Sequence, residues 1–433
     1  MKLAPAIARL PRLEALMPMA LRYMASGGSL IVSSAAQLLT FAILARWLGV
    51  EQFGLFVALT AITSVSLQLC GLGSLECLVR RVARDPAIYP SMLGHTAILS
   101  ATTGVLLVGA GMAILPFLFT ISPDPATNVL AIGLLLFANI ILARIILSVE
   151  QVFLAHSQFG AANRNVLTYA IGRLAAAVLG CVAFGTNNLA DWAVWNLASH
   201  AVVAGLALWS IRPLGRARWT IVREEIRLGV LFSTPFILRA VRQNTDLLVL
   251  TALTSPEIVG SYSVARRIFE SGYLSVEALN RLIYPGSAAI TVNGLHHAMD
   301  RVKKVLVAAL GISTFTAVTI FILAPLLPYL FGHDYVSLVP FTRVICWLII
   351  VMAIYAVALE ALGASGLQHA RAMVLNGASL AGGALIAWAT WQFGISGTFG
   401  AVYITEIGTA VAAWIVLLHI ARNGERLAAK AAE

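Results

Sequence analysis

Long apolar stretches separated by short polar segments recur along the whole chain. A run of about 20 apolar residues is long enough to cross ~30 Å of hydrocarbon as a helix. We therefore expect an all-α polytopic membrane protein with about twelve membrane-spanning helices. The predicted spans are residues 27–48, 54–76, 91–115, 128–149, 165–185, 190–211, 228–253, 258–284, 304–328, 341–362, 372–392 and 396–419.

The basic residues between these spans occur mainly in alternate loops. The loop of residues 211–227 alone holds five arginines, and the loops on the opposite side are short and almost free of Lys and Arg. Because cytoplasmic loops carry the excess of positive charge, both termini are predicted to be cytoplasmic. The net charge of +10 follows from this asymmetry, so a nucleic-acid partner is not needed to explain it.

Composition agrees with a membrane protein and excludes several function classes. Only 11% of the 433 residues are charged, whereas soluble domains carry roughly 25%. The short loops leave no room for an extramembrane catalytic domain, and the sequence has no GxxxxGK phosphate loop. The four cysteines have no metal-ligand spacing and are expected to be small apolar residues. We therefore expect no enzyme activity, no cofactor and no metal.

The spans are predicted to form two copies of a six-span unit. Gln37 matches Gln243 at an offset of 206, and at the same offset LGVEQFGLF (48–56) matches TSPEIVGSY (254–262). An even number of spans gives both units the same orientation, and parallel repeats of this kind enclose a site near the membrane midplane. The predicted organisation is a cytosolic or interfacial N-terminal arm (1–26), an N-lobe (27–211), a basic cytoplasmic linker (212–227), a C-lobe (228–420) and a cytoplasmic tail (421–433).

The stretch RAVRQNTDLLVL, residues 239–250, places charges in the middle of the seventh span. Helical spacing puts these polar residues on one face. A charge at the bilayer centre costs about 2.5–3.5 kcal/mol, so this face is expected to meet protein or a water-filled cavity. The residues on it are Arg239, Arg242, Gln243 and Asp246.

The eighth span has a similar charged face. Its residues are Arg266, Glu270, Tyr273, Glu277 and Arg281, with Arg267 beside them. One interpretation is that pairs such as Arg242–Asp246 and Arg266–Glu270 only neutralise each other and fix helix packing. The other is a cationic cavity for an anionic ligand, which is favoured because Arg239 and Arg267 lack an obvious local partner.

The predicted site follows the second interpretation. Guanidinium groups hold phosphate oxygens through paired hydrogen bonds. The predicted substrate-binding cations are Arg239, Arg242, Arg266 and Arg267. The candidates for cavity lining or ion coupling are Gln37, Gln243, Asp246, Glu270, Glu277 and Glu360.

Several segments are similar to bacterial polysaccharide, or oligosaccharide, flippases of the O-antigen (Wzx) type, within the multidrug/oligosaccharidyl-lipid/polysaccharide exporter superfamily. The segments are ARWLGVEQFGLFVALTAI (45–62), GLGSLECLVRRVARD (71–85), residues 226–268, ALGASGLQHA (361–370) and FGISGTFGAVYITE (393–406). The resemblance covers nearly the whole chain. It implies two six-helix lobes around a central cavity that work by alternating access.

The resemblance also implies a function. It is the transfer of an undecaprenyl-diphosphate-linked oligosaccharide from the cytoplasmic to the outer leaflet of the bacterial inner membrane, for surface polysaccharides such as O-antigen of lipopolysaccharide or exopolysaccharide. The lipid bilayer holds the tail of this substrate, and the cationic cavity holds its head. H⁺ or Na⁺ is the candidate coupling ion, and a polysaccharide polymerase is a candidate partner. Asp246 and Glu270 depart from a purely cationic lining because they cancel part of its charge.

Three other functions agree less well with the sequence. A cation-coupled multidrug or toxic-compound exporter of the same superfamily is the alternative, but such a pump is expected to have an acidic cavity. A membrane enzyme that polymerises or transfers glycans would need a large outward loop with paired carboxylates. A scaffold without transport activity leaves the charges in the middle of the membrane unexplained.

Overall fold

The computed structural model describes residues 13–291, 295–365 and 367–432, and within these ranges all regular structure is helical. Eight of the described segments are long and apolar enough to cross a membrane. The prediction of an all-α, multi-pass membrane protein is confirmed at this level. The number of twelve crossings and the side of the termini stay predictions. Residues 1–12 of the N-terminal arm lie outside the described residues.

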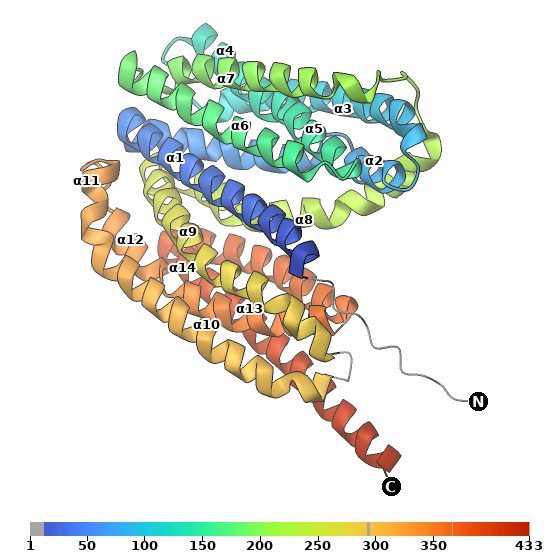
Figure 1. Ribbon diagram of the computed structural model, residues 1–433. Helices are drawn as coiled ribbons and strands as arrows, with labels where there is room; N and C mark the ends of the chain where they lie inside the picture. The colour runs from blue at the N-terminus through green and yellow to red at the C-terminus, as the bar shows by residue number, and fades with distance from the viewer. Residues whose placement is uncertain (1–12, 292–294, 366, 433) are drawn as a thin grey trace.

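The first half of the chain forms one group of packed helices, here named the N-terminal bundle (blue to green in Figure 1). Its α-helices are α1 (Leu13–Leu69), α2 (Ser74–Val82), α3 (Tyr89–Leu118), α4 (Pro125–Leu136), α5 (Ala143–Ala155), α6 (Phe159–Ala177) and α7 (Leu189–Ser210). Two π-helical segments, η2 (Phe137–Leu142) and η3 (Val178–Ala183), and the 3₁₀ turn η1 (Pro86–Ile88) complete it.

The second half forms the C-terminal bundle (yellow-green to red in Figure 1). Its α-helices are α8 (Arg223–Leu253), α9 (Pro256–Thr291), α10 (Leu295–Leu323), α11 (Leu327–Phe331), α12 (Leu338–Ile345), α13 (Leu348–Ala364) and α14 (Gln368–Ala432). The 3₁₀ turn η5 (Ala324–Leu326) precedes α11. Helices α8 and α9 are not among the eight apolar segments, because the predicted charged residues interrupt their apolar stretches.

Two of the predicted loops are single kinks. Helix α1 includes the predicted span 27–48 and residues 54–69 of the next one, and it departs from helical geometry at Gly49 (φ 73°). Helix α14 does so at Gly394 (φ 58°). Glycine adopts positive φ without the steric penalty of a Cβ. A single glycine therefore redirects the chain at each position, where the sequence pattern predicted a longer break.

The span predicted at 54–76 is not one helix. Helix α1 ends at Leu69, and a turn with positive φ at Gly71, Leu72 and Gly73 precedes α2. Three consecutive residues in this conformation end the helical hydrogen-bond pattern. The second predicted span is thus a broken helix whose interruption lies among apolar residues.

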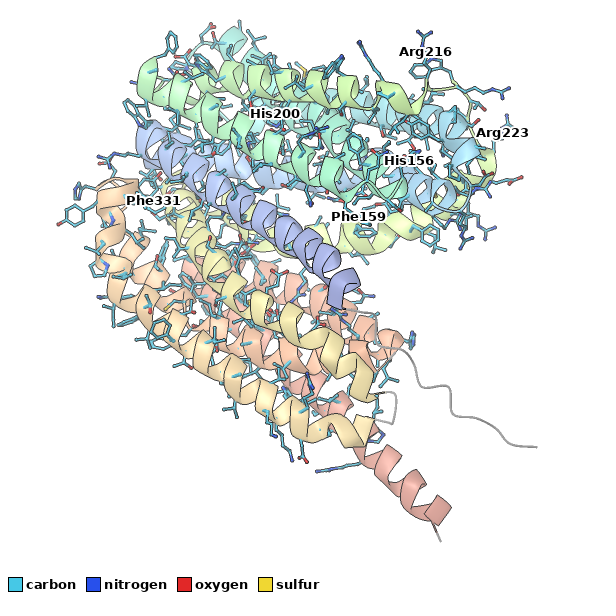
Figure 2. The ribbon with its side chains drawn as sticks, in the orientation of Figure 1. His156, Phe159, His200, Arg216, Arg223 and Phe331 are labelled. Atoms are coloured by element: carbon cyan, nitrogen blue, oxygen red, sulfur yellow. The ribbon has the colours of Figure 1, made fainter. Side chains whose placement is uncertain are left out.

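The two bundles meet along α1, which packs against α8 and α9. Figure 2 shows Arg216 and Arg223 at one end of the molecule and Phe331 at the other. The predicted basic linker holds the 3₁₀ turn η4 (Arg212–Leu214) and lies against the N-terminal bundle: the Arg218 N–H donates to the Pro90 carbonyl over 2.7 Å. The linker is therefore packed against the N-terminal bundle.

Candidate substrate-binding site

Asp246 is the centre of the charged group between α8 and α9. Its Oδ1 lies 2.5 Å from Nη1 of Arg266, and its Oδ2 accepts a hydrogen bond from the Tyr262 hydroxyl over 2.7 Å. The N–H of Leu247 also donates to Oδ1 over 2.9 Å. Only 11% of the Asp246 side chain is exposed. A buried carboxylate is tolerated when it is paired and hydrogen-bonded in this way.

Arg266 is held by both helices. Its Nε lies 3.0 Å from Oε1 of Glu270, one turn further along α9. Its Nη2 donates to the backbone carbonyl of Gln243 on α8. All three guanidinium nitrogens thus have partners, so Arg266 links α8 to α9 and is not a free cation.

Arg267 reaches across to the N-terminal bundle. Its Nη2 donates to Oε1 of Gln37 on α1 over 3.0 Å, and its Nη1 lies 3.5 Å from Oε2 of Glu270. The third nitrogen, Nε, is buried and has no hydrogen-bond partner among the described residues. The structure therefore brings three predicted site residues together where α1 and α9 meet.

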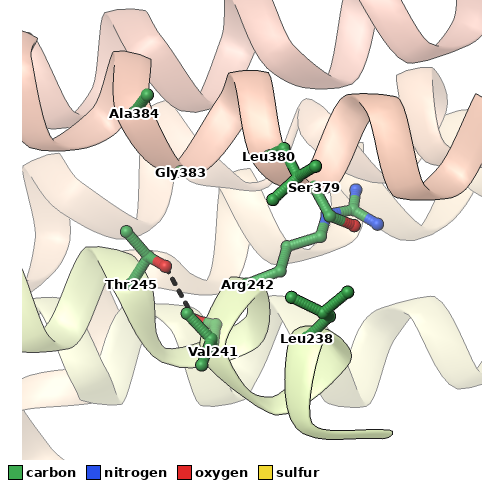
Figure 3. Close-up of a pocket in the computed structure, with 8 residues that line it drawn as sticks. All are labelled: Leu238, Val241, Arg242, Thr245, Ser379, Leu380, Gly383 and Ala384. Carbon is green, nitrogen blue, oxygen red and sulfur yellow. Dashed lines mark hydrogen bonds between the residues drawn. The ribbon is translucent and has the colours of Figure 1, made fainter. Parts of the chain in front are cut away.

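Arg242 points to a different helix. Its Nη2 lies 3.2 Å from Oε1 of Glu406 on α14, so the Arg242–Asp246 pair considered from the sequence is wrong. Asp246 pairs instead with Arg266, which approaches from α9. Arg242 also lines a groove of about 290 Å³ between α8 and α14 (Figure 3). The other lining residues are Leu238, Val241, Thr245, Ser379, Leu380, Gly383 and Ala384.

Arg239 differs from the other three arginines. Its side chain is exposed, and it has no hydrogen bond or ion pair within the described part of the chain. Gln243, one turn further along α8, is also exposed. Of the four predicted cations, Arg239 is therefore the one whose guanidinium is free to meet a ligand.

The remaining candidates lie within the C-terminal bundle. Glu360 on α13 pairs with Arg371 on α14 over 3.1 Å. Tyr273 lies within electrostatic range of Glu277, Glu360 and Glu406, so these carboxylates share one region. The side chain of Arg281 is outside the described residues. The structure thus divides the predicted site into a group beside α1 and a group around Glu406.

Two partners were absent from the predicted site. In the sequence, Tyr262 belongs to the repeated segment 254–262, and Arg371 lies in the loop between the predicted spans 341–362 and 372–392. The available signal was the general requirement that an intramembrane charge needs a partner. That requirement does not say which residue supplies it.

The group beside α1 keeps a small positive surplus. Arg266 and Arg267 are paired there with Asp246 and Glu270, and Arg239, seven residues before Asp246 on the same face of α8, adds one positive charge. Such a group can bind an anion through Arg239 while the paired residues hold the helices in place. It contains no cluster of acid, base and nucleophile suited to bond cleavage.

Solved transporters share this fold. The chain is similar to an inward-facing MATE family multidrug resistance transporter of the MOP superfamily, with a TM-score of 0.71, 15% identity, and coverage of 90% of this chain and 95% of that one. It is also similar to the lipid II flippase MurJ in an inward closed conformation, with a TM-score of 0.72, 14% identity, and coverage of 93% and 90%. No curated protein matches the sequence.

The family model described as "Polysaccharide biosynthesis protein" matches residues 24–290. This match covers more than half of the chain and includes α8 and α9 with their charged group. The similarity expected from the sequence is therefore confirmed, and the chain belongs to the polysaccharide biosynthesis protein family, with the fold of MOP-superfamily transporters.

Proposed function

We propose that the protein is a flippase that moves an undecaprenyl-diphosphate-linked oligosaccharide from the cytoplasmic to the outer leaflet of a bacterial inner membrane. In this proposal twelve helices form two parallel six-helix lobes with both termini cytoplasmic. The lobes alternate in exposing the central site, and the lipid tail stays in the bilayer. The family membership and the likeness to a lipid II flippase support a lipid-linked substrate.

The observation that carries the proposal is the exposed Arg239, which has no ion-pair partner among the described residues. It lies on the same face of α8 as Asp246, two helical turns before it. A diphosphate loses its hydration when it leaves water, and a guanidinium fork replaces part of that hydration. Arg239 supplies this contact without first breaking an ion pair. By contrast, Arg242 must part from Glu406 before it can bind a phosphate.

The carboxylates make the binding reversible. Four unpaired arginines would hold a diphosphate strongly and slow its release, because each charge-assisted hydrogen bond contributes about 1.5–3 kcal/mol. Asp246 and Glu270 compensate Arg266, and Glu270 also contacts Arg267. A moderate positive field suits a carrier that must bind on one side and release on the other.

The test uses a native host that lacks this gene, in which lipid-linked oligosaccharides are quantified by mass spectrometry and assigned to a leaflet. Wild type, Arg239→Gln and Arg216→Gln are expressed at matched membrane levels. Arg216 is an exposed linker arginine, so its variant controls for the loss of one positive charge. We expect wild type and Arg216→Gln to clear the cytoplasmic intermediates, and Arg239→Gln to be slower by about tenfold or more.

A drug exporter of the same superfamily is the second candidate, because a MATE transporter shares the fold with a TM-score of 0.71. The same deletion strain distinguishes the two. If loss of the gene leaves every lipid-linked glycan unchanged and raises sensitivity to cationic dyes, the exporter is the correct assignment. If intermediates accumulate but Arg239→Gln clears them as wild type does, the flippase assignment stands and the site is wrong.

A further inference from the structure

A second polar cluster lies inside the N-terminal bundle, at the break between α1 and α2. The turn there has φ values of 83° at Gly71, 47° at Leu72 and 74° at Gly73. Leucine rarely adopts positive φ, and such strain persists only when the surroundings enforce it. The Gly71 N–H donates to Oγ1 of Thr103 on α3 over 2.7 Å, which fixes the turn against the neighbouring helix.

Three hydrogen-bond donors converge on Gly71. The point that a Cβ of residue 71 would occupy lies 2.7 Å from Nη2 of Arg144, 2.7 Å from Oγ of Ser100 and 3.1 Å from Oγ of Ser74. These atoms come from α5, α3 and α2 respectively. Any other residue at position 71 would put a carbon between them, so the glycine leaves the space between the three donors free.

All three donors are buried without a partner. Arg144 is 5% exposed, and its Nε and Nη2 have no hydrogen-bond partner among the described residues. The hydroxyls of Ser74 and Ser100 are in the same state. No carboxylate of the described residues lies within ion-pair distance of Arg144, although Glu76 is within electrostatic range. A buried charge without a directly bonded counter-charge costs several kcal/mol, and Glu76 compensates the guanidinium only from a distance, which makes a directly bound partner favourable.

We propose that Arg144, Ser74 and Ser100 bind a small inorganic monoanion of the chloride class. The three groups supply donors and one positive charge, which is the complement of an anion. The ligand is small because the donors lie so close to the backbone of Gly71. It is singly charged because the Glu76 carboxylate, nearby on α2, repels a second negative charge.

The geometry of α5 supports a dedicated site. The π-helical segment Phe137–Leu142 ends one residue before α5 begins, and Arg144 is in the first turn of that helix. Such π-bulges are frequent at functional sites because they change the direction of the side chains that follow. The site is built from α2, α3 and α5, whereas the proposed substrate site uses α1, α8 and α9. The two proposals therefore do not depend on each other.

The experiment measures the thermal unfolding of the purified full-length protein in detergent. Sodium chloride is titrated against sodium gluconate at constant ionic strength. We expect chloride to raise the Tm of wild type along a saturable curve. Ser100→Ala should weaken the apparent chloride affinity by about tenfold, the effect of losing one hydrogen bond to a charged group.

Ser148→Ala is the matched control. Ser148 is on the same helix as Arg144, and its hydroxyl donates to the Arg144 backbone carbonyl over 2.7 Å. This variant makes the same chemical change without touching the proposed site, so its chloride curve should equal that of wild type. Crystals soaked in bromide should show an anomalous peak between Arg144 and Ser100.

Two results would overturn the proposal. One is a wild-type Tm that is equal in chloride and gluconate, with no bromide peak beside Arg144. The other is a chloride effect that Ser100→Ala and Ser148→Ala change equally, which would place the anion elsewhere. In either case water satisfies the guanidinium and the hydroxyls.

Discussion

The backbone of Gly54 in α1 packs directly against the backbone of Pro256 at the start of α9. A Cβ on Gly54 would lie 1.9 Å from the Pro256 carbonyl oxygen, and a Cβ on Gly260 would lie 2.5 Å from that of Val50. The offset of 206 relates Gly54 to Gly260 and Val50 to Pro256. One contact is thus the counterpart of the other, as a two-fold relation between two similar halves produces.

Substitution of Gly54 by alanine should separate α1 from α9. Real Cβ atoms do not approach a carbonyl oxygen this closely, so the helices must move apart. We expect a loss of about 1–3 kcal/mol of stability, which is the usual cost of overpacking. The measurement is thermal unfolding in detergent, together with a spin-label distance between α1 and α9. Gly260→Ala should act in the same direction.

Gly109→Ala is the control for this pair. Gly109 is inside α3, and a Cβ there meets no atom within 4 Å. Alanine is the better helix former by roughly 0.5–1 kcal/mol, so this variant should be as stable as wild type or more stable. An unchanged α1–α9 distance in Gly54→Ala would contradict the close packing described above.

The sequence predicted the membrane class, the two charged helices and the presence of the polar residues between them. It did not predict the partners. The spacing of Arg242 and Asp246 on one helix allowed an ion pair, but Arg266 from α9 and Glu406 from α14 took those places. Which residue pairs with a given charge depends on how each helix is rotated about its axis and on which distant segments pack against it. The spacing of residues along one helix contains no information on the rotation of that helix or on its neighbours.

The break in the second predicted span was also not predictable from the sequence, in this case because it concerns the backbone. Residues 54–76 have the hydropathy of a continuous helix, whereas the structure ends α1 at Leu69. The glycines at 71 and 73 were the available signal. However, isolated glycines are tolerated inside membrane helices, so only the packing around Arg144 and Ser100 distinguishes a break from a continuous span.

The Arg242–Glu406 pair predicts a large effect for a single substitution. Glu406→Gln leaves a largely buried guanidinium without its carboxylate, which should cost about 3–5 kcal/mol. The double variant Arg242→Leu/Glu406→Leu removes both charges and should recover most of that loss. Thermal unfolding of the single and double variants measures the coupling.

An exposed pair provides the comparison. Lys303 and Asp300 lie 3.5 Å apart with 70% and 90% of their side chains exposed. Such pairs contribute about 0–1 kcal/mol, so Asp300→Asn should leave the Tm nearly unchanged. Equal effects of Glu406→Gln and Asp300→Asn would mean that solvent screens the Arg242 pair as well.

Substitution of Arg239 tests whether the charged residues act in transport or only fix the packing of the helices. If the charged residues only fix the helices, every arginine variant should lose stability in proportion to its lost contacts. Arg239 has no such contacts among the described residues. We therefore expect Arg239→Gln to lose transport but to keep the wild-type Tm, because its free energy of unfolding should change by no more than about 0.5 kcal/mol. A variant with normal stability and normal transport would remove Arg239 from the site.

Tyr335, at the junction of the two bundles, is expected to make a pH-dependent contribution to the free energy of unfolding. It lies in the segment between α11 and α12, outside the apolar spans. Its hydroxyl donates a hydrogen bond to the Ala45 carbonyl of α1 over 2.8 Å. Burial raises the pKa of this phenol, so the folded state binds the proton more tightly than the unfolded state, whose tyrosine ionises near pH 10. The stabilisation is full below about pH 10 and is lost as the pH rises beyond it.

Tyr335→Phe removes both the hydrogen bond and the ionisable group. At pH 8 we expect the variant to be less stable than wild type by about 1 kcal/mol. At pH 10.8 (about 0.8 above the usual tyrosine pKa) the difference should be smaller, because ionisation of unfolded Tyr335 lowers only the stability of wild type. Denaturant unfolding at both values measures the two gaps. A gap that widens with pH would show that Tyr335 is already ionised in the folded protein, and an ionised phenol could not donate to Ala45.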